Sequence, residues 1–303
     1  MTRSVLLLVS LLITSASAQE SETYNRRPVA DDTYQAYLEF FNYDRELPLE
    51  GRVAYVESGF DGYRREKLVF RSCGGDLVPG FLALPNDSTL APFPVILAAH
   101  GAGDGITSGK NKTYIREWMD VLTAAGYAVL AIDAKYYNER AHEAFFAGTR
   151  EMMARPHLRR DAFIQTVVDW RRGIDYLESR PDIDTDRLGF VGSSMGTMYG
   201  MILCAVDQRI LAAIFKVGGM FPDERAPRPP IDQINYIGRI APRPLLMVNG
   251  LKDAGWATTG AKKIYGYAGE PKKNLWYDTG HDLPTHHFQD EMVSLFRRHL
   301  KGK

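Results

Sequence analysis

The chain has only two cysteines in 303 residues, Cys73 and Cys204. So few thiols exclude a disulfide-stabilised scaffold and a metal site built from cysteine ligands. Cys73 comes just before an expected strand and Cys204 falls within an expected helix. We therefore expect two buried thiols, with a bridge between them as the alternative in an oxidising compartment.

The chain also lacks an excess of charge of either sign, because 37 Lys and Arg balance 37 Asp and Glu. The basic residues are dispersed, so we expect no nucleic-acid partner and no binding to an anionic membrane surface. No apolar run approaches the roughly 20 residues that a membrane-spanning helix needs. The composition thus points away from nucleic-acid and membrane partners, and it carries no signal about oligomeric state.

The first residues have the pattern of a secretory signal peptide. Arg3 supplies a positive start, residues 5–13 are nearly all apolar, and Ala16-Ser17-Ala18 is a small-residue cleavage site. We expect removal after Ala18 and a secreted or periplasmic location. The alternative is a buried N-terminal helix.

Residues 19–303 are expected to form a single α/β domain. The apolar runs 95–99 and 127–132, with a helical pattern at 115–125 between them, predict a mostly parallel sheet with helices on both faces. Further strands are expected at 65–71, 77–84, 188–191, 212–217, 242–249 and 273–277, and further helices at 31–41, 161–178, 197–206 and 290–300. We expect a turn at 181–186 and a small cap insertion over the site at about 135–160, where aromatic residues and methionines mix with charges.

A candidate nucleophile lies in Gly192-Ser193-Ser194-Met195-Gly196, between an expected strand and an expected helix. In this context a Gly-x-Ser-x-Gly motif places a serine on a sharp turn, and its two glycines let strand and helix pass close together. Ser194 has glycine at both required offsets, whereas Ser193 would need a glycine at position 191. Ser194 is therefore the expected nucleophile.

A serine hydroxyl needs a histidine to take its proton, and that histidine needs a carboxylate to orient it. His281 follows the expected strand 273–277, and Asp253 follows the expected strand 242–249. Both positions are at carboxyl ends of strands, where open α/β sheets hold their sites. We expect His281 as the base and Asp253 as the acid, with Asp133 as the second choice for the acid.

An ester-type intermediate also needs N–H donors for its oxyanion. Met195 follows the candidate nucleophile at the start of a helix, and its backbone N–H is one expected donor. The loop His100-Gly101-Ala102-Gly103 is expected to supply the other, with Ala102 preferred and Gly101 or Gly103 as alternatives. We expect His100 to brace this loop by hydrogen bonds rather than to transfer protons.

The substrate surroundings are less marked in the sequence. Tyr136 and Trp256, with Gly101 and Gly103, are expected to line an apolar substrate site; the alternative is that the aromatic residues only pack surface loops. No cluster has metal-ligand spacing and no cofactor motif is present, so we expect neither a metal nor a cofactor.

From about residue 73 onward, the chain resembles secreted serine hydrolases of the α/β-hydrolase superfamily, near the dienelactone-hydrolase-like and acetyl-xylan-esterase-like branches. The motifs that carry the resemblance are His100-Gly101-Ala102-Gly103, Asn138-Glu139-Arg140, residues 170–177, Gly192-Ser193-Ser194-Met195-Gly196, Asp253 and Gly280-His281-Asp282. The resemblance implies the α/β-hydrolase fold and hydrolysis of a small-molecule ester by Ser194, Asp253 and His281. Dienelactone hydrolases proper have cysteine at the elbow, so their lactone specificity does not carry over.

Two other functions use the same features. A serine peptidase or amidase of the prolyl-oligopeptidase type has similar motifs, but the propeller-sized N-terminal region that gates peptides in those enzymes is not found in this sequence. A non-catalytic binding protein could keep the fold without the reaction. The presence of a nucleophile, a base, an acid and an oxyanion loop favours the ester hydrolase.

Overall fold

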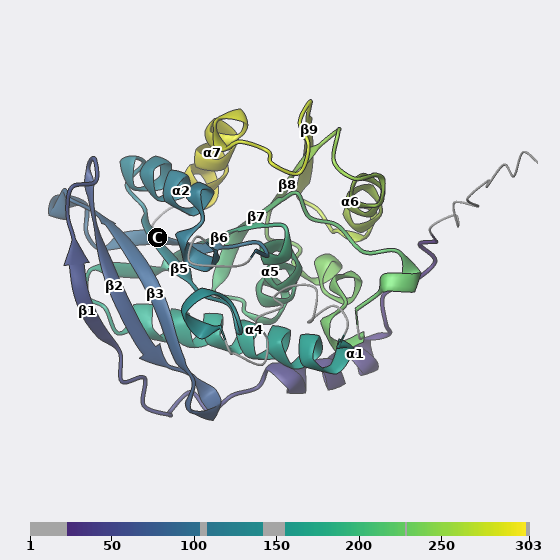
Figure 1. Ribbon diagram of the computed structural model, residues 1–303, viewed down its shortest axis with the longest axis horizontal. Coiled ribbons are helices and arrows are strands. Elements are labelled where there is room, and N and C mark those ends of the chain that lie inside the picture. Colours follow the sequence, from purple (N-terminus) through teal and green to yellow (C-terminus); the bar gives the residue numbers. More distant parts are fainter. Residues whose placement is uncertain (1–22, 104–107, 142–154, 228, 301–303) are drawn as a thin grey trace, which may run out of the picture.

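The computed structural model describes residues 23–103, 108–141, 155–227 and 229–300 (Figure 1). Its strands are β1 (Arg52–Glu57), β2 (Tyr63–Arg71), β3 (Leu77–Pro85), β4 (Phe93–Ala99), β5 (Ala128–Ile132), β6 (Ile183–Ser193), β7 (Ile210–Lys216), β8 (Leu245–Gly250) and β9 (Lys272–Tyr277). Its α-helices are α1 (Asp31–Leu38), α2 (Thr113–Ala124), α4 (Pro156–Glu178), α5 (Met195–Val206), α6 (Gly255–Tyr267) and α7 (Gln289–His299). Short 3₁₀ turns lie between several of these elements.

The strands form one nine-stranded sheet in the order β1-β2-β3-β5-β4-β6-β7-β8-β9. Antiparallel pairing joins β1 to β2, β2 to β3 and β3 to β5, and every neighbouring pair from β5 to β9 is parallel. The carboxyl ends of the parallel strands therefore meet at one edge of the sheet, where the loops after β4, β6, β8 and β9 lie close together.

Helices cover both faces of this sheet (Figure 1). Along β4, Val95 and Leu97 pack with α4 and α5, whereas Ile96 and Ala98 pack with α2 and α7 on the opposite face. Successive side chains of a strand point to opposite faces, so a strand covered on both faces reads as a continuous apolar run. The predicted fold class, a mostly parallel sheet with helices on both faces, is confirmed.

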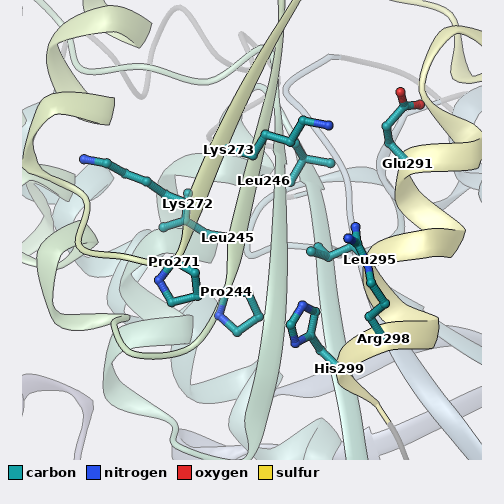
Figure 2. Close-up of a pocket in the computed structure, with 10 residues that line it drawn as sticks. All are labelled: Pro244, Leu245, Leu246, Pro271, Lys272, Lys273, Glu291, Leu295, Arg298 and His299. Atoms are coloured by element: carbon teal, nitrogen blue, oxygen red, sulfur yellow. The ribbon is translucent and has the colours of Figure 1, made fainter.

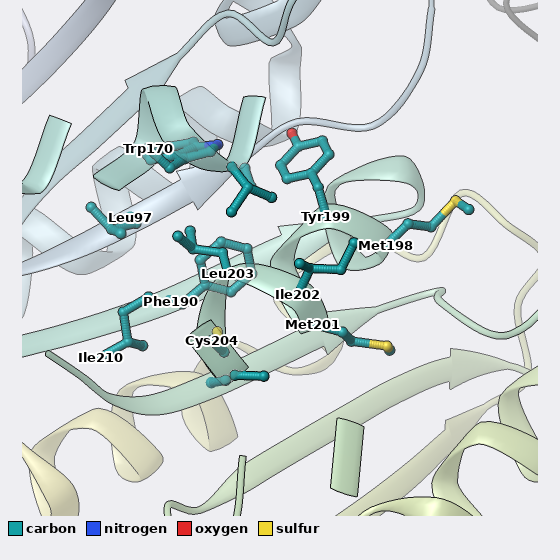
Figure 3. Close-up of a cluster of buried hydrophobic side chains, with 14 of the residues drawn as sticks. Leu97, Trp170, Phe190, Met198, Tyr199, Met201, Ile202, Leu203, Cys204 and Ile210 are labelled. Carbon is teal, nitrogen blue, oxygen red and sulfur yellow. The ribbon is translucent and has the colours of Figure 1, made fainter. Parts of the chain in front are cut away.

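Helix α5 is the most deeply buried helix next to the central strands. Its side chains pack against Leu97 of β4, Trp170 of α4 and Phe190 of β6 in one apolar cluster (Figure 3). Cys204 is part of this cluster and is a free thiol, and Cys73 is free as well. An amphipathic pattern is absent from α5 because apolar neighbours surround it on all sides.

Three larger differences from the sequence prediction concern the starts of α4 and β6 and the presence of β1. Helix α4 begins at Pro156 rather than at Asp161, because a proline in the first turn of a helix loses no hydrogen bond. Strand β6 begins at Ile183, within the segment expected to be a turn, because it pairs there with Phe93 and Pro94. Strand β1 was not expected at all, although its residues 53–56 are apolar; this edge strand leaves its side chains mostly exposed.

The expected cap insertion at 135–160 divides into three parts. Residues 135–141 are a loop with a single 3₁₀ turn, Asn138–Arg140, and residues 156–160 are the first turns of α4 rather than part of a cap. Residues 142–154 lie outside the described residues. Helix α6, which follows β8 directly, was also not expected from the sequence.

Candidate active site

Ser194 lies between β6 and α5 in a backbone conformation that residues other than glycine rarely adopt, with φ 53° and ψ −116°. Glycine is required on both sides of this turn. A Cβ atom on Gly196 would lie 2.4 Å from the carbonyl oxygen of Ala99, and one on Gly192 would lie 2.7 Å from the carbonyl oxygen of Gly196. The tight crossing of strand and helix forces Ser194 into a strained turn at the carboxyl edge of the sheet.

His281 connects Ser194 to Asp253. Its Nε2 atom lies 2.9 Å from Ser194 Oγ, and its Nδ1 atom lies 2.8 Å from Asp253 Oδ2. Asp253 follows β8 and His281 follows β9, so parallel neighbouring strands deliver the two side chains to the same edge. The Asp253 side chain is 9% exposed and that of His281 is 47% exposed, so the imidazole lies at the mouth of the site.

Two other carboxylates have different partners. Asp133 is fully buried and accepts hydrogen bonds from Lys110 Nζ at 2.6 Å and Asn138 Nδ2 at 3.1 Å. Asp278, next to the His281 loop in sequence, pairs with Lys252 at 2.8 Å in an exposed position. Asp253 is therefore the carboxylate that the structure brings to His281, and Asp133, the second choice from the sequence, is a structural ion-pair residue.

The backbone N–H groups of Met195 and of the loop after β4 are the candidate oxyanion donors near Ser194. Met195 is the first residue of α5, so its N–H has no acceptor within the helix. Gly101 packs against the elbow, and a Cβ atom there would lie 3.1 Å from Ser194 Cβ, but its N–H already donates to the Tyr114 hydroxyl at 2.6 Å. Ala102, the next residue, lines the same cavity as Ser194 and Met195. Of the loop residues, Ala102 is thus better placed than Gly101 to offer a donor.

His100 anchors the loop after β4 through hydrogen bonds of its ring. Its Nε2 accepts a hydrogen bond from the Ala134 N–H at 3.0 Å, so its Nδ1 carries the proton and donates to the Gly101 carbonyl at 2.8 Å. Burial lowers the pKa of His100, which keeps the ring neutral. The Tyr199 hydroxyl donates to the His100 carbonyl at 2.8 Å. This histidine therefore braces the loop, as expected from the sequence.

Lys216 and Tyr114 were not singled out from the sequence. Lys216 ends β7, and its carbonyl accepts the Ser194 N–H at 2.9 Å. Its ammonium group is buried, 3.4 Å from Ser193 Oγ and 4.8 Å from the Tyr114 ring centroid. Burial lowers the pKa of Lys216 to about 8, and burial raises that of Tyr114 to about 12. In the sequence, the only sign of a special role for Lys216 is its position at the end of an apolar strand. Its place behind the elbow depends on the fold.

A cavity of about 300 Å³ opens beside Ser194. Within the described part of the chain its lining is mainly apolar and consists of Ala102, Tyr137, Arg159, Phe163, Ser194, Met195, Met198, Phe221, Arg225 and Trp256. Trp256 stacks on Phe221 with ring centroids 4.9 Å apart, which makes a flat aromatic wall. The size and lining are suited to a small organic substrate.

The structure separates the four residues expected around the substrate. Trp256 lines the cavity, and Gly101 packs against the elbow instead. Tyr136 is not among the described lining residues; its neighbour Tyr137 takes that place, because Tyr136 adopts a positive φ of 68° and lies near Lys135. Gly103 packs closely against the side chain of Lys112. A Cβ atom on Gly103 would lie only 2.6 Å from Lys112 Nζ.

A second hollow, of about 190 Å³, lies between the starts of β8 and β9 and the end of α7 (Figure 2). Pro244, Pro271 and Lys272 line it at the amino ends of the strands. Ser194 and His281 lie at the carboxyl ends, on the opposite edge of the sheet. This hollow is therefore separate from the serine site, and its described lining includes no serine, threonine or cysteine.

Two features are absent from residues 23–103, 108–141, 155–227 and 229–300. No cluster of three His, Cys, Asp or Glu side chains could hold a metal ion in this part of the chain. No helix formed by these residues combines the length and the apolarity needed to cross a bilayer.

Comparison with known proteins gives one curated relative and many structural neighbours. No family model matches the chain. YtaP of Bacillus subtilis (strain 168), itself a hydrolase by inference only, is 30% identical over 156 residues, which are 49% of this chain and 51% of YtaP. The chain thus matches about half the length of this relative.

Several of the solved structures that resemble this one are esterases. Acetyl xylan esterase 1 from Thermoanaerobacterium sp. has a TM-score of 0.68 at 17% identity, covering 91% of this chain and 96% of that one. The acetyl xylan esterase from Paenibacillus sp. R4 has a TM-score of 0.68 at 19% identity, covering 92% and 98%. A cold-adapted esterase from an Arctic intertidal metagenomic library has a TM-score of 0.65 at 20% identity, covering 82% and 98%. Together with the strand–serine–helix turn and the sheet order, these similarities show that this chain has the α/β-hydrolase fold.

Proposed function

We propose that this protein is a carboxylic ester hydrolase that acts through an acyl-enzyme on Ser194. The observation that carries the proposal is the position of His281, whose two ring nitrogens lie 2.9 Å from Ser194 Oγ and 2.8 Å from Asp253 Oδ2. This is the arrangement in which an imidazole can accept a proton from a hydroxyl while a carboxylate stabilises the resulting charge. The esterase structures that share the fold support the same reaction class.

In the acylation step Ser194 Oγ attacks the ester carbonyl carbon as its proton passes to His281 Nε2. The Met195 N–H and the Ala102 N–H donate to the oxyanion of the tetrahedral intermediate. Its collapse breaks the bond to the alkoxy oxygen, and His281 returns the proton to the departing alcohol. The acyl group stays on Ser194.

Deacylation repeats these steps with water. A water molecule gives a proton to His281 Nε2 and attacks the acyl carbon, and the carboxylic acid leaves as Ser194 regains its proton. His281 is about half exposed, so water reaches the imidazole without a conformational change. Asp253 keeps the Nδ1 proton in place throughout, which fixes the tautomer that both steps need.

The cavity supports a small ester as the substrate. Its volume of about 300 Å³ and its wall of Trp256 and Phe221 suit a short acyl group and a compact alcohol rather than a polypeptide. Two of the structural neighbours are named acetyl xylan esterases. The substrate class proposed for this chain is accordingly short acyl esters of a sugar or a small alcohol.

A direct test is acyl-chain-length profiling of purified protein with p-nitrophenyl esters from acetate to decanoate. We expect turnover that is fastest with short chains and that falls by at least about 10³-fold in a folded Ser194→Ala variant. Labelling of the wild-type protein, and not of the variant, by a fluorophosphonate would identify the nucleophile. Undiminished turnover in Ser194→Ala would overturn the proposed mechanism.

We further propose that residues 19–303 are a single domain that is exported after cleavage behind Ala18. The support is the pattern of Arg3, the apolar residues 5–13 and the small residues before the cleavage point. Expression of the full chain in a bacterial host, followed by mass spectrometry of the periplasmic fraction, should yield a protein that begins at Gln19. An intact N-terminus in the cytosolic fraction would contradict export.

A further inference from the structure

Arg159 is a buried arginine that lines the cavity beside Ser194. It is 6% exposed, although its side chain ends in a cation. Within the part of the chain that the structure describes, its guanidinium has neither a hydrogen-bond acceptor nor an ion-pair partner. What it does contact is aromatic: its Cζ atom lies 5.1 Å from the Phe221 ring centroid and 5.6 Å from that of Phe163.

The other buried arginines of this region are paired, which makes Arg159 an exception. Arg172, in the same helix, is 1% exposed and bonds to Asp175 at 3.2 Å and to the Arg45 carbonyl at 2.9 Å. Arg140 is 6% exposed and bonds to Asp169 at 2.6 Å. The fold thus supplies a carboxylate for buried guanidinium groups elsewhere.

The acid whose charge influences Arg159 is Asp232, but the two side chains form no hydrogen bond or ion pair within the described part of the chain. Asp232 Oδ2 accepts from Arg26 at 2.7 Å, and its buried Oδ1 has no hydrogen-bond partner among the described residues. Burial lowers the pKa of Arg159 to about 10, so the group still carries its charge at neutral pH. Aromatic faces offset part of the cost of burying a cation, but they supply no acceptor for its N–H groups.

The rest of the cavity has the same sign of charge. Arg225 is a second guanidinium in the lining, with its Cζ atom 5.1 Å from the Trp256 ring centroid. Among the described residues that line the cavity, none is Asp or Glu. A positively charged apolar cavity next to a nucleophilic serine favours an anionic ligand over a neutral one.

We propose that Arg159 binds a carboxylate of the substrate, so that the preferred esters carry a free carboxylate besides the ester group. This inference rests on the ester hydrolase function proposed above and adds the substrate class. A guanidinium presents two parallel N–H donors that match the two oxygens of a carboxylate. The bound carboxylate would supply the partner that the fold leaves out, and the aromatic walls would exclude water from the pair.

The carboxylate can belong to either half of the ester, and two matched substrate pairs distinguish these cases. The acyl pair is monomethyl adipate and its ω-carboxamide analogue, in which a neutral amide replaces the carboxylate. The alcohol pair is 4-acetoxybenzoate and 4-acetoxybenzamide. Each pair differs by one charge at nearly constant size, and hydrolysis is followed by pH-stat or by chromatography.

The variants are Arg159→Gln and Arg159→Lys, with Arg160→Gln as the matched control. Arg160 is adjacent and also cationic, but it pairs with Asp161 and is not among the described residues that line the cavity. In the wild-type protein we expect kcat/KM to be at least about tenfold higher for the charged member of one pair. Arg159→Gln should remove that preference by slowing the charged member alone, Arg159→Lys should keep part of it, and Arg160→Gln should leave it unchanged.

Equal ratios of charged to neutral turnover in the wild type and in Arg159→Gln, for both pairs, would overturn the inference. Hydrolysis of the neutral esters, lost in Ser194→Ala, would still support the proposed function, so the two failures are distinguishable. If Arg159→Gln does not fold, product inhibition of the wild-type protein decides. Stronger competitive inhibition by adipate than by adipamide, which carries no carboxylate, or by 4-hydroxybenzoate than by 4-hydroxybenzamide, supports the carboxylate site, and equal inhibition in both comparisons overturns it.

Discussion

The Tyr114 hydroxyl accepts the N–H of Gly101 at 2.6 Å, and this bond ties the loop after β4 to the first turn of α2. The same loop carries Ala102, one of the two proposed oxyanion donors. Tyr114 lies against Lys216, behind the elbow that presents Ser194. One tyrosine, which is not among the described residues that line the cavity, thus contacts both the loop that carries Ala102 and the lysine behind the elbow.

Replacement of Tyr114 by phenylalanine tests this connection. The variant leaves the Gly101 N–H without its acceptor, so we expect a loss of about 1–2 kcal/mol in the free energy of unfolding. Because the loop loses its anchor, kcat should fall about tenfold while KM changes little. Urea unfolding and steady-state kinetics with a short-chain ester measure both effects. A fall in stability with unchanged kcat would limit Tyr114 to a structural role.

Replacement of Asp253 by asparagine tests the proposed acid. An amide cannot hold the imidazole in the required tautomer or stabilise its charged form, so kcat should fall about 10³- to 10⁴-fold. Asp278→Asn is the matched control, since Asp278 is exposed and pairs with Lys252. The control should keep nearly full activity, as measured in the same assay. Equal losses in the two variants would remove Asp253 from its proposed role.

Replacement of Lys216 by methionine tests the buried ammonium. Desolvation lowers its pKa from 10.5 to about 8, with Asp282 and Glu117 opposing the shift. Between pH 8 and pH 10.5 the unfolded chain therefore binds a proton that the folded protein has released, and stability rises with pH across that window.

The methionine variant has no such group. Relative to the variant, the wild-type protein should gain up to about 3 kcal/mol in the free energy of unfolding as the pH rises through this window. Urea unfolding of both proteins at pH 7, 8, 9 and 10 measures the difference. A constant difference at all four pH values would show that Lys216 has an ordinary pKa.

Replacement of Gly196 by alanine tests the packing at the elbow. The new Cβ atom would lie 2.4 Å from the Ala99 carbonyl oxygen and 2.8 Å from that of His100. Because both contacts are to backbone, we expect destabilisation by about 3 kcal/mol or more. Gly255→Ala is the control, since a Cβ atom there meets nothing within 4 Å. Thermal unfolding should show a neutral or slightly stabilised control, and two equally stable variants would contradict the packing described here.

Much of this molecule was predictable from local sequence. Apolar runs such as 95–99 identify buried strands, because a strand covered on both faces has no polar positions. The two glycines around Ser194 identify the elbow, because only glycine tolerates the backbone contacts that the turn requires. These features depend on near neighbours in the chain, and so the sequence alone determined them.

The tertiary structure decided what depends on distant segments. It brought Asp253 rather than Asp133 to His281, because the order of β8 and β9 in the sheet sets which loops meet. It also turned Tyr137 rather than Tyr136 toward the cavity and left Arg159 in its wall. Packing between elements far apart in the chain decides which charged side chains are paired and which are left to bind a substrate. No local sequence pattern predicts this outcome.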